Sequence, residues 1–307
     1  MHYLVTGGCG FIGSHLIELL LEDGHTVTVI DNLSTGKREN IPASVKLVVS
    51  DVTTPGVFDD IVTKVDGCFH LAAIVSVQLS AEDWLRTHQV NQSATVALFD
   101  ALAKKKRPLP VVYASSAATY GDCPDIPLRE TANTTPLSAY GVDKLVCEWQ
   151  ARIASTIHGI PSIGLRFFNV YGERQDPASP YSGVISIFAS RMKKNQPITV
   201  FGDGSQTRDF IYVGDIARGL AASMQALEKK KIKYGVYNLC TGIQTALTEL
   251  IKIIAGITHS TSAVTNGSTR VGDIRYSAGS TELSKKELGF TAATLLKDGL
   301  QRTLKDL

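Results

Sequence analysis

The sequence lacks the features that would assign it to a membrane, to nucleic acid or to an oxidising compartment. It contains no run of about 18 or more apolar residues, the length that spans a bilayer. Its opening, MHYLVTGG, has neither the charged head nor the cleavage site of a signal peptide. Lys and Arg number 31 against 29 Asp and Glu, so no excess of basic charge favours a nucleic-acid or membrane surface. The five cysteines form no CxxC pair, as expected of buried thiols in a reducing compartment. We expect a cytoplasmic globular protein that binds neither nucleic acid nor membrane and holds no metal.

The sequence does have enough apolar residues for a large core, and strand and helix patterns alternate along it. It has 307 residues, of which 44% are apolar, and this length predicts about two domains or lobes. Short apolar runs rich in branched residues predict strands at 3–5, 26–30, 45–49, 67–71, 111–114 and 163–167. Helical patterns occur at 12–23, 84–105, 140–158, 213–229 and 245–257. This alternation predicts an α/β fold with a parallel sheet covered by helices on both faces.

The composition changes after about residue 170, where Pro, Gly and Ser become frequent. The change predicts a first lobe at 1–170 and a smaller lobe formed by 171–208 and 246–307, with 209–245 returning to the first lobe. Residues 258–268 are small and polar, and we expect them to form a surface loop.

A glycine-rich segment, VTGGCGFIGSH, follows the first predicted strand and opens the first predicted helix. Gly7, Gly10 and Gly13 have the spacing GxxGxxG. Such a loop turns tightly, lets a pyrophosphate approach the backbone and brings the helix close to the sheet, and each of these demands excludes a Cβ atom. The helix N-terminus offers its free N–H groups to the phosphates.

Asp31 ends the second predicted strand, eighteen residues after Gly13. At this place a carboxylate accepts hydrogen bonds from the adenosine ribose hydroxyls, and it repels a 2′-phosphate. NAD is therefore preferred to NADP, although Lys37 and Arg38 nearby keep NADP as an alternative.

A candidate catalytic group follows in the middle of the chain. Tyr140 and Lys144 are four residues apart in a predicted helix, so their side chains share a face. The strand VVYASS ends in Ser115 and Ser116, at the edge where a parallel sheet holds its ligand. A lysine cation and an oxidised nicotinamide favour the tyrosine phenolate, which then removes a proton from an alcohol while a serine hydroxyl relays it. Ser116, Tyr140 and Lys144 are the predicted catalytic residues.

These motifs, taken in order, resemble the extended short-chain dehydrogenase/reductase family, and within it the nucleotide-sugar 4-epimerases and dehydratases. The likeness covers almost the whole chain, and SSAATYG, YGVDK, RFFNVYG, VFGDGSQTRDFIYVGDI and RVGDIRYS carry it beside the glycine loop. The resemblance implies a Rossmann-type, doubly wound NAD-binding lobe at 1–170 and a smaller α/β lobe that binds a nucleoside-diphosphate sugar. It also implies a homodimer formed through the helices at 84–105 and 140–158.

The resemblance also implies site residues. Those expected to contact NAD lie in the glycine loop, at the strand ends and in the catalytic helix: Gly7, Gly10, Phe11, Ile12, Gly13, Asp31, Asn32, Asp51, Val52, Leu71, Ala72, Ala73, Asn91, Tyr140, Lys144 and Phe167. Those expected to contact a UDP-sugar are Ser116, Asn169, Val184, Phe201, Arg208, Phe210, Arg270, Asp273 and Ser277. Arg208 and Arg270 are the expected diphosphate ligands, because a guanidinium group matches phosphate oxygens.

The residues after Ser116 favour one reaction of the family. Ala117, Ala118 and Thr119 stand where dehydratases of the family have an Asp-Glu pair and decarboxylases a Glu, so no acid is placed to expel water. We therefore expect 4-epimerisation of a UDP-hexose through a transient 4-keto sugar. A dehydratase, decarboxylase or reductase of the family is the alternative, and a non-catalytic NAD-sensing protein is a further one.

Ser277, seven residues after Arg270, stands where 4-epimerases of this kind have the residue next to the sugar's 2-substituent. A small residue there admits an N-acetyl group, and a larger pocket does not strongly exclude a smaller ligand. We expect activity on UDP-GlcNAc and UDP-GalNAc beside UDP-glucose and UDP-galactose. The alternative is that Ser277 only ends a strand.

Overall fold

A computed structural model of the chain describes residues 1–104, 108–177, 183–268 and 274–306. Its centre is a seven-stranded sheet in the order β11-β6-β5-β4-β1-β2-β3, and every neighbouring pair in it is parallel. The strands are β1 (His2–Thr6), β2 (Thr26–Asp31), β3 (Lys46–Val49), β4 (Gly67–His70), β5 (Val111–Ser116), β6 (Ser162–Phe167) and β11 (Tyr234–Leu239). The predicted α/β fold with a Rossmann-type parallel sheet is confirmed.

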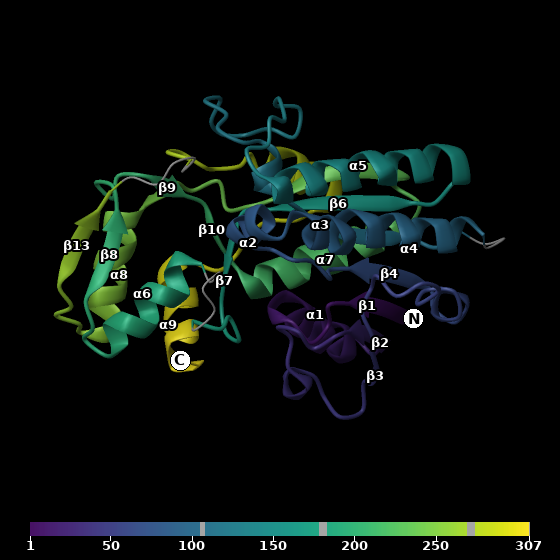
Figure 1. Cartoon of the computed structure of the whole chain (residues 1–307), viewed down its shortest axis with the longest axis horizontal. Helices are drawn as coiled ribbons and strands as arrows, with labels where there is room; N and C mark the ends of the chain where they lie inside the picture. The colour runs from purple at the N-terminus through teal and green to yellow at the C-terminus, as the bar shows by residue number, and fades with distance from the viewer. Residues whose placement is uncertain (105–107, 178–182, 269–273, 307) are drawn as a thin grey trace.

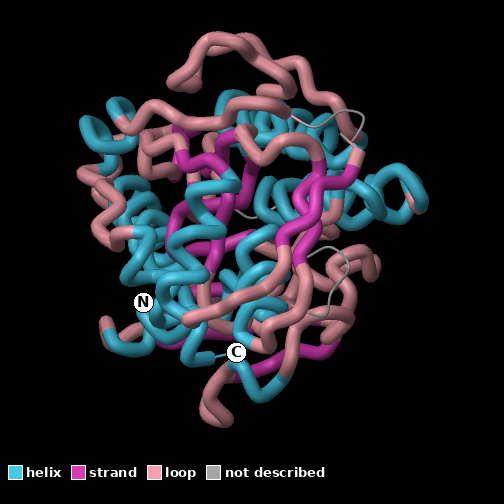
Figure 2. The backbone as a smooth tube through the Cα atoms, turned by 90° about the vertical axis from the view of Figure 1, so that its left-hand side faces the viewer, coloured by secondary structure: helices cyan, strands magenta, loops and turns pink. Residues whose placement is uncertain are grey.

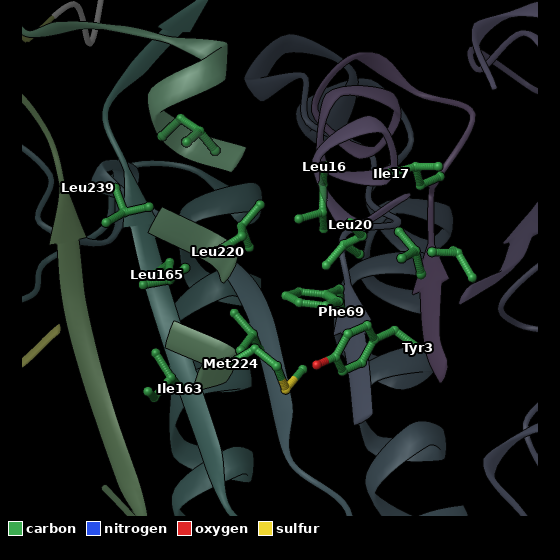
Figure 3. Close-up of a cluster of buried hydrophobic side chains, with 14 of the residues drawn as sticks. Tyr3, Leu16, Ile17, Leu20, Phe69, Ile163, Leu165, Leu220, Met224 and Leu239 are labelled. Carbon is green, nitrogen blue, oxygen red and sulfur yellow. The ribbon is translucent and has the colours of Figure 1, made fainter. Parts of the chain in front are cut away.

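Helices cover both faces of this sheet (Figure 1). One face carries α1 (Phe11–Glu22) and α7 (Val213–Glu228), and the other carries α3 (Trp84–His88), α4 (Ala94–Ala103) and α5 (Ala139–His158). Leu16 and Leu20 of α1 and Leu220 and Met224 of α7 pack around Phe69 of the sheet (Figure 3). Central strands such as β1, β4 and β6 are buried on both faces and are therefore continuous apolar runs, which is why the sequence predicted them. The edge strand β11 was not predicted, because its sequence YGVYNL lacks such a run.

The helix predicted over 84–105 is divided in the structure. The side chain of Asp83 accepts a hydrogen bond from the Arg86 amide at the start of α3, and Gln89–Ser93 form a π-helical turn before α4. The extra residue of such a turn shifts the helix face, and π-turns of this kind often occur at functional sites. By contrast, α5 is continuous: Ser138 caps its first turn and Gly159, in the left-handed region, ends it.

The smaller lobe lies at the carboxyl ends of the strands and faces the viewer in Figure 2. Its core includes Phe188, Leu250 and Leu300 from three helices. The elements that follow β6, apart from α7 and β11, are β7 (Asn169–Tyr171), α6 (Val184–Lys193), β8 (Ile198–Phe201), β9 (Thr207–Arg208), β10 (Phe210–Tyr212), β12 (Thr245–Ala246), α8 (Leu247–Thr258), β13 (Val264–Gly267) and α9 (Leu296–Asp306). The remaining helical segments are α2 (Val77–Glu82), the 3-10 turns Arg38–Asn40, Ile61–Thr63 and Ala117–Thr119, and the π-turn Ser284–Leu288.

One prediction about this lobe is wrong. Residues 258–268 were expected to form a loop, but Val264–Gly267 form β13, which pairs in parallel with β8. The strand is short and mostly exposed, so it lacks the apolar pattern by which buried strands are recognised.

Of the cysteines, Cys9, Cys68, Cys147 and Cys240 are buried and Cys123 is half-buried, and all five are free thiols. Among the described residues, no helix combines the length and the apolar composition needed to cross a membrane.

Candidate active site

A cleft of about 890 Å³ runs along the carboxyl ends of the central strands. The sheet order reverses at β1, which lies between β2 and β4, and ligands of open α/β sheets bind at such a switch point. The cleft brings together seventeen of the predicted site residues: Gly7, Gly10, Phe11, Ile12, Gly13, Asp31, Asn32, Asp51, Val52, Leu71, Ala72, Ala73, Ser116, Tyr140, Lys144, Phe167 and Asn169.

The glycine loop forms the floor of the cleft, and its backbone packs too tightly for side chains. Gly7 has a φ of +69°, and a Cβ on it would lie 2.8 Å from the amide nitrogen of Ala72. A Cβ on Gly13 would lie 2.3 Å from the carbonyl oxygen of Gly7. Gly10 is the N-cap of α1 and makes no side-chain cap, so the N–H groups of the first turn remain available to an anion.

Asp31 is fixed at the carboxyl end of β2. Its Oδ1 accepts a hydrogen bond from the Leu33 amide at 2.8 Å, and its Oδ2 accepts one from the Cys9 amide at 3.0 Å. Each carboxylate oxygen keeps capacity for a further donor such as a ribose hydroxyl. The Arg38 guanidinium group donates to the carbonyl oxygen of Ile41 at 2.9 Å, whereas Lys37 lines the cleft.

Asp51 accepts four hydrogen bonds. Oδ1 accepts from the amide and the hydroxyl of Thr53, at 2.9 and 2.6 Å, and Oδ2 accepts from Asn32 Nδ2 at 2.8 Å and Arg86 Nη2 at 2.5 Å. Burial raises the pKa of Asp51, but these donors outweigh it and hold the pKa well below its usual range. A donor on NAD, such as the adenine amino group, would therefore compete with Arg86 and Asn32 for the Asp51 carboxylate.

The three predicted catalytic side chains meet where β5 faces α5. The Tyr140 hydroxyl faces the Ser116 side chain, which favours the phenolate and lowers the Tyr140 pKa in part. Lys144 Nζ donates to the carbonyl oxygen of Ala114 at 2.9 Å and lies 5.9 Å from the centre of the Tyr140 ring. Ser116 Oγ also accepts from the Ala118 amide at 3.1 Å, which fixes its direction.

Burial disfavours both charged forms that a proton transfer here needs, the Tyr140 phenolate and the Lys144 cation. It raises the pKa of Tyr140 to about 12, although the Ser116 side chain lowers it in part. Burial also lowers the pKa of Lys144, while nearby Cys147 and Asp143 oppose that shift. A positive charge near the phenol, such as an oxidised nicotinamide ring, lowers the tyrosine pKa again.

His70, at the end of β4, is buried close to Lys144 and is therefore neutral. Burial, helped by the charge of Lys144, lowers the pKa of His70 to about 3. Its Nδ1 lies 2.8 Å from Thr6 Oγ1, and this oxygen accepts from the amides of Leu71 and Ala72 at 3.1 and 3.2 Å. The Thr6 hydroxyl proton is therefore donated to His70, and the pair fixes the cleft wall at Leu71 and Ala72.

Other predicted residues do not line this cleft: Asn91, Val184, Phe201, Arg208, Phe210 and Ser277. Asn91 lies behind the wall, where its Oδ1 accepts from the Ile74 amide at 2.8 Å and its Nδ2 donates to the Ile74 carbonyl at 3.0 Å. It holds the wall in place and does not face the cleft. Phe210 is buried in the core of the smaller lobe. Arg270 and Asp273 lie outside the described residues.

Some side chains of the site were not foreseen from the sequence. Arg86 reaches Asp51 from a distant helix, and no motif marks it. Arg174 lines the cleft and donates through Nη2 to Glu18 at 2.6 Å, while its amide donates to Asp306 at 2.7 Å. Arg174 thus links the two lobes. The motif RFFNVYG ends only two residues before it, and this is the signal that could have found it.

The fold and the cleft define an α/β enzyme of the dinucleotide-binding class with a serine–tyrosine–lysine site. The family model described as the NAD dependent epimerase/dehydratase family matches residues 3–240. The chain belongs to this family, and NAD is its cofactor.

Known proteins resemble the chain over most of its length. A putative UDP-glucose 4-epimerase of Methanocaldococcus jannaschii is 39% identical, over 82% of this chain and 80% of the relative. The structure of a UDP-glucose 4-epimerase of Thermotoga maritima, solved with UDP-glucose, superposes with a TM-score of 0.94 at 32% identity, covering 100% of this chain and 98% of that one. A UDP-N-acetylglucosamine 4-epimerase of Methanobrevibacter ruminantium, solved with UDP-N-acetylmuramic acid, gives 0.93 at 34% identity, over 99% and 97% of the two chains.

The relatives do not all share one reaction. A UDP-N-acetyl-alpha-D-glucosaminuronate decarboxylase of Bacillus cytotoxicus is 30% identical, over 85% of this chain and 81% of the relative. Family membership therefore leaves the choice between epimerisation and decarboxylation to the residues of the site.

The glycine loop generates a test of cofactor binding. We expect Gly13→Ala to weaken NAD binding by about tenfold or more, because its Cβ forces the loop away from the phosphates. Gly256→Ala is the matched control, since this helical glycine has open space around it. Calorimetric titration with NAD measures the effect, and circular dichroism checks that both variants fold. Wild-type affinity in a folded Gly13→Ala protein would show that the loop does not hold the cofactor.

Proposed function

We propose that the protein interconverts UDP-hexoses and their 4-epimers through a transient 4-keto sugar, with NAD restored at the end of each cycle. The meeting of Ser116, Tyr140 and Lys144 in one cleft, with Lys144 Nζ 5.9 Å from the centre of the Tyr140 ring, carries this proposal. It supplies one proton acceptor and one relay, which suffices to oxidise a secondary alcohol and to reduce the ketone again.

NAD bound in the cleft would supply the acceptor for the hydride at C4 of the sugar and the donor for its return to the other face of the ketone. Tyr140, as the phenolate, takes the proton of the 4-hydroxyl group through the Ser116 hydroxyl and gives it back when the ketone is reduced. Lys144 is held against the carbonyl of Ala114, where its cation stabilises the phenolate. The Gly7–Gly13 loop and Asp31 are suited to the pyrophosphate and the ribose of NAD.

The side chains after Ser116 favour epimerisation over the other reactions of the family. Ala117, Ala118 and Thr119 form a short 3-10 turn that carries no acid to protonate a leaving hydroxyl group. Without such an acid the ketone is consumed by the return of the hydride. Release of NADH or of carbon dioxide, or formation of a 4-keto-6-deoxy sugar, would instead indicate one of the alternatives.

The smaller lobe is the proposed site for the UDP-sugar. Arg208 is on β9, and Asn169 of β7 lines the cleft. Asp209 joins the loops around them, since it accepts hydrogen bonds from the amides of Thr241 at 2.8 Å, Gly242 at 2.8 Å and Gly279 at 3.3 Å. With Val184, Phe201, Arg270, Asp273 and Ser277 at the positions given by the family resemblance, this lobe has cations for a diphosphate and apolar groups for a base.

Ser277 is the proposed determinant of the sugar's 2-substituent. It is 9% exposed and lies two residues before Gly279, at which a Cβ would come within 2.7 Å of the Phe168 ring. Phe168 lines the cleft, so the segment that carries Ser277 packs directly behind the cleft wall. A small side chain there supports activity on N-acetylated UDP-hexoses beside the plain ones.

We further propose a homodimer formed through α3, α4 and α5, which lie side by side on one face of the molecule (Figure 1). These helices expose Trp84 and Leu85 on α3 and Trp149, Ile153 and Ile157 on α5. Large apolar side chains at four-residue spacing along a helix form a continuous stripe, and such stripes on a surface mark protein contacts.

Removal of the Tyr140 hydroxyl tests the mechanism. We expect Tyr140→Phe to lower kcat by about 10²–10⁴-fold, since the proton acceptor is lost while the ring still packs. NAD affinity should stay within twofold of wild type. Tyr3→Phe is the control, because it removes a hydroxyl that is bonded to Glu228 and lies outside the cleft. In wild type, kcat should fall as pH drops through the pKa of Tyr140 in the NAD complex. Near-normal turnover of Tyr140→Phe would mean that another group is the base.

Substitution of the residue behind the cleft wall tests the choice of sugar. We expect Ser277→Tyr to lose UDP-GlcNAc and UDP-GalNAc activity by about tenfold or more while keeping the plain pair, because its ring fills the space of the N-acetyl group. Ser277→Ala, which stays small, should retain both pairs. Epimerisation rates on the two substrate pairs provide the measurement. An unchanged preference in Ser277→Tyr would assign the selection to another residue.

Charge placed on the apolar stripe of α5 tests the dimer. We expect Trp149→Glu combined with Ile153→Glu to elute as a monomer in size-exclusion chromatography with light scattering, because carboxylates are costly to bury. Ile243→Glu places the same charge at an exposed apolar position on a loop and should leave the dimer intact. The proposal fails if the wild type is a monomer or if the α5 variant still dimerises.

A further inference from the structure

A buried ion pair lies directly behind the catalytic serine. Arg166 of β6 donates through Nε to Oε1 of Glu148 at 2.9 Å and through Nη2 to Oε2 at 2.7 Å. The two side chains are 5% and 4% exposed. Ser115, next to Ser116 in β5, donates its hydroxyl to Glu148 Oε1 at 2.5 Å. The proposed reaction makes no direct use of these three groups.

A gain in folding stability alone does not explain the buried Arg166–Glu148 ion pair. Well-packed apolar side chains of similar volume are often as stable as a buried ion pair or more stable, because two charges lose their hydration. Two parallel N–H···O bonds, however, fix the direction of both side chains. Arg166 and Ser115 are directly opposite each other in the β5–β6 register, so adjacent strands reach the same carboxylate from one face of the sheet.

The position of Glu148 on α5 connects the pair to catalysis. Glu148 lies four residues after Lys144 and eight after Tyr140, so these side chains project from one helix face in successive turns. Lys144 Nζ donates to the carbonyl oxygen of Ala114 in β5 at 2.9 Å. Glu148 accepts a hydrogen bond from the hydroxyl of Ser115, the next residue of that strand. Successive turns of α5 are thus attached to the last three residues of β5, and the turn with Tyr140 meets Ser116.

Arg166 is itself held from the side away from α5. Its guanidinium group lies 4.6 Å from the centre of the Tyr120 ring, and Nη1 donates to the carbonyl oxygen of Glu130 at 3.3 Å. The Tyr120 hydroxyl donates to Asn238 Oδ1 at 2.7 Å, on the neighbouring strand β11. The carboxylate of Glu148 is therefore fixed by a hydrogen-bond network that extends across β5, β6 and β11.

We propose that Ser115, Glu148 and Arg166 are positioning residues that set the register of α5 on β5, so that the Tyr140 hydroxyl meets that of Ser116. The inference rests on the proposed function in taking Tyr140 as the proton acceptor. A displacement of about 1 Å in a catalytic group costs about 10²-fold in rate. Loss of one attachment therefore lowers kcat although the proposed reaction uses none of the three residues directly.

Ser115→Ala tests the proposal most directly, because it removes one hydrogen bond and leaves the ion pair intact. The matched control is Ser223→Ala, which removes a buried hydroxyl that donates to the Gly219 carbonyl within α7. We expect kcat of Ser115→Ala to fall by about tenfold or more. The KM for the UDP-hexose, the NAD affinity and the melting temperature should match those of the control. The acidic limb of the kcat–pH profile should move to higher pH, because a phenolate less well held by Ser116 has a higher pKa.

A second pair of variants separates positioning from folding. We expect Glu148→Gln to lower both kcat and the melting temperature, because it leaves the Arg166 charge unpaired in the core. Glu148→Leu combined with Arg166→Met should recover the melting temperature but not kcat. Crystal structures of Ser115→Ala and wild type should show the Ser116–Tyr140 contact lengthened in the variant.

Turnover within twofold of wild type in Ser115→Ala, or full recovery of kcat in the double variant, would overturn the proposal. Single-turnover reduction of bound NAD by the UDP-sugar keeps this test separate from that of the proposed function. If wild type reduces the cofactor but forms no 4-epimer, the proposed function fails while the positioning role is still measured by the reduction rate.

Discussion

The close contact between the end of β1 and the start of α1 is the constraint on which the rest of the molecule depends. A Cβ on Gly13 would lie 2.3 Å from the Gly7 carbonyl oxygen, so the two backbones meet without side chains between them. Because no side chain can repack to relieve this contact, it fixes α1 on the sheet. Leu16 and Leu20 then determine where α7 lies, and α7 follows directly after β10 of the smaller lobe (Figure 3). One backbone approach thus shapes the cleft floor and helps to place the lobe beyond it.

Hydrogen-bonded carboxylates give the cleft its fixed shape. At the end of β2, Asp31 accepts backbone donors, and after β3, Asp51 accepts backbone and side-chain donors. Asp209 accepts three amides from two loops. Charge-assisted hydrogen bonds of this kind are about twice as strong as neutral ones. The walls are therefore organised before a ligand arrives, and less conformational freedom is lost on binding.

The sequence predicted six of the seven strands of the sheet, all but β11, and the shared face of Tyr140 and Lys144, because both depend on local patterns. Strands buried on both faces are continuous apolar runs, and Tyr140 and Lys144 share a face through helix geometry alone. The break between α3 and α4 escaped prediction because a π-turn has no composition of its own. Arg86 escaped for a different reason: its contact with Asp51 spans 35 residues and depends on how α3 packs. Asn91 was expected to contact NAD; its side chain bonds both backbone groups of Ile74 in the cleft wall, and its contact with the cofactor stays a prediction.

The two sides of the cleft differ in how easily they can change. On the sheet side, Glu148, Arg166 and Ser115 are buried, and each holds another, so a single substitution leaves an unpaired polar group in the core. In the smaller lobe, outside the residues that line the cleft, Phe201, Ile243 and Tyr276 are exposed, and substitutions at such positions cost little stability. Substitutions are therefore tolerated more readily in the smaller lobe than where α5 is attached to β5. This asymmetry gives a physical reason why one fold can serve different nucleotide sugars, and the similar structures include a UDP-glucose 4-epimerase and a UDP-N-acetylglucosamine 4-epimerase.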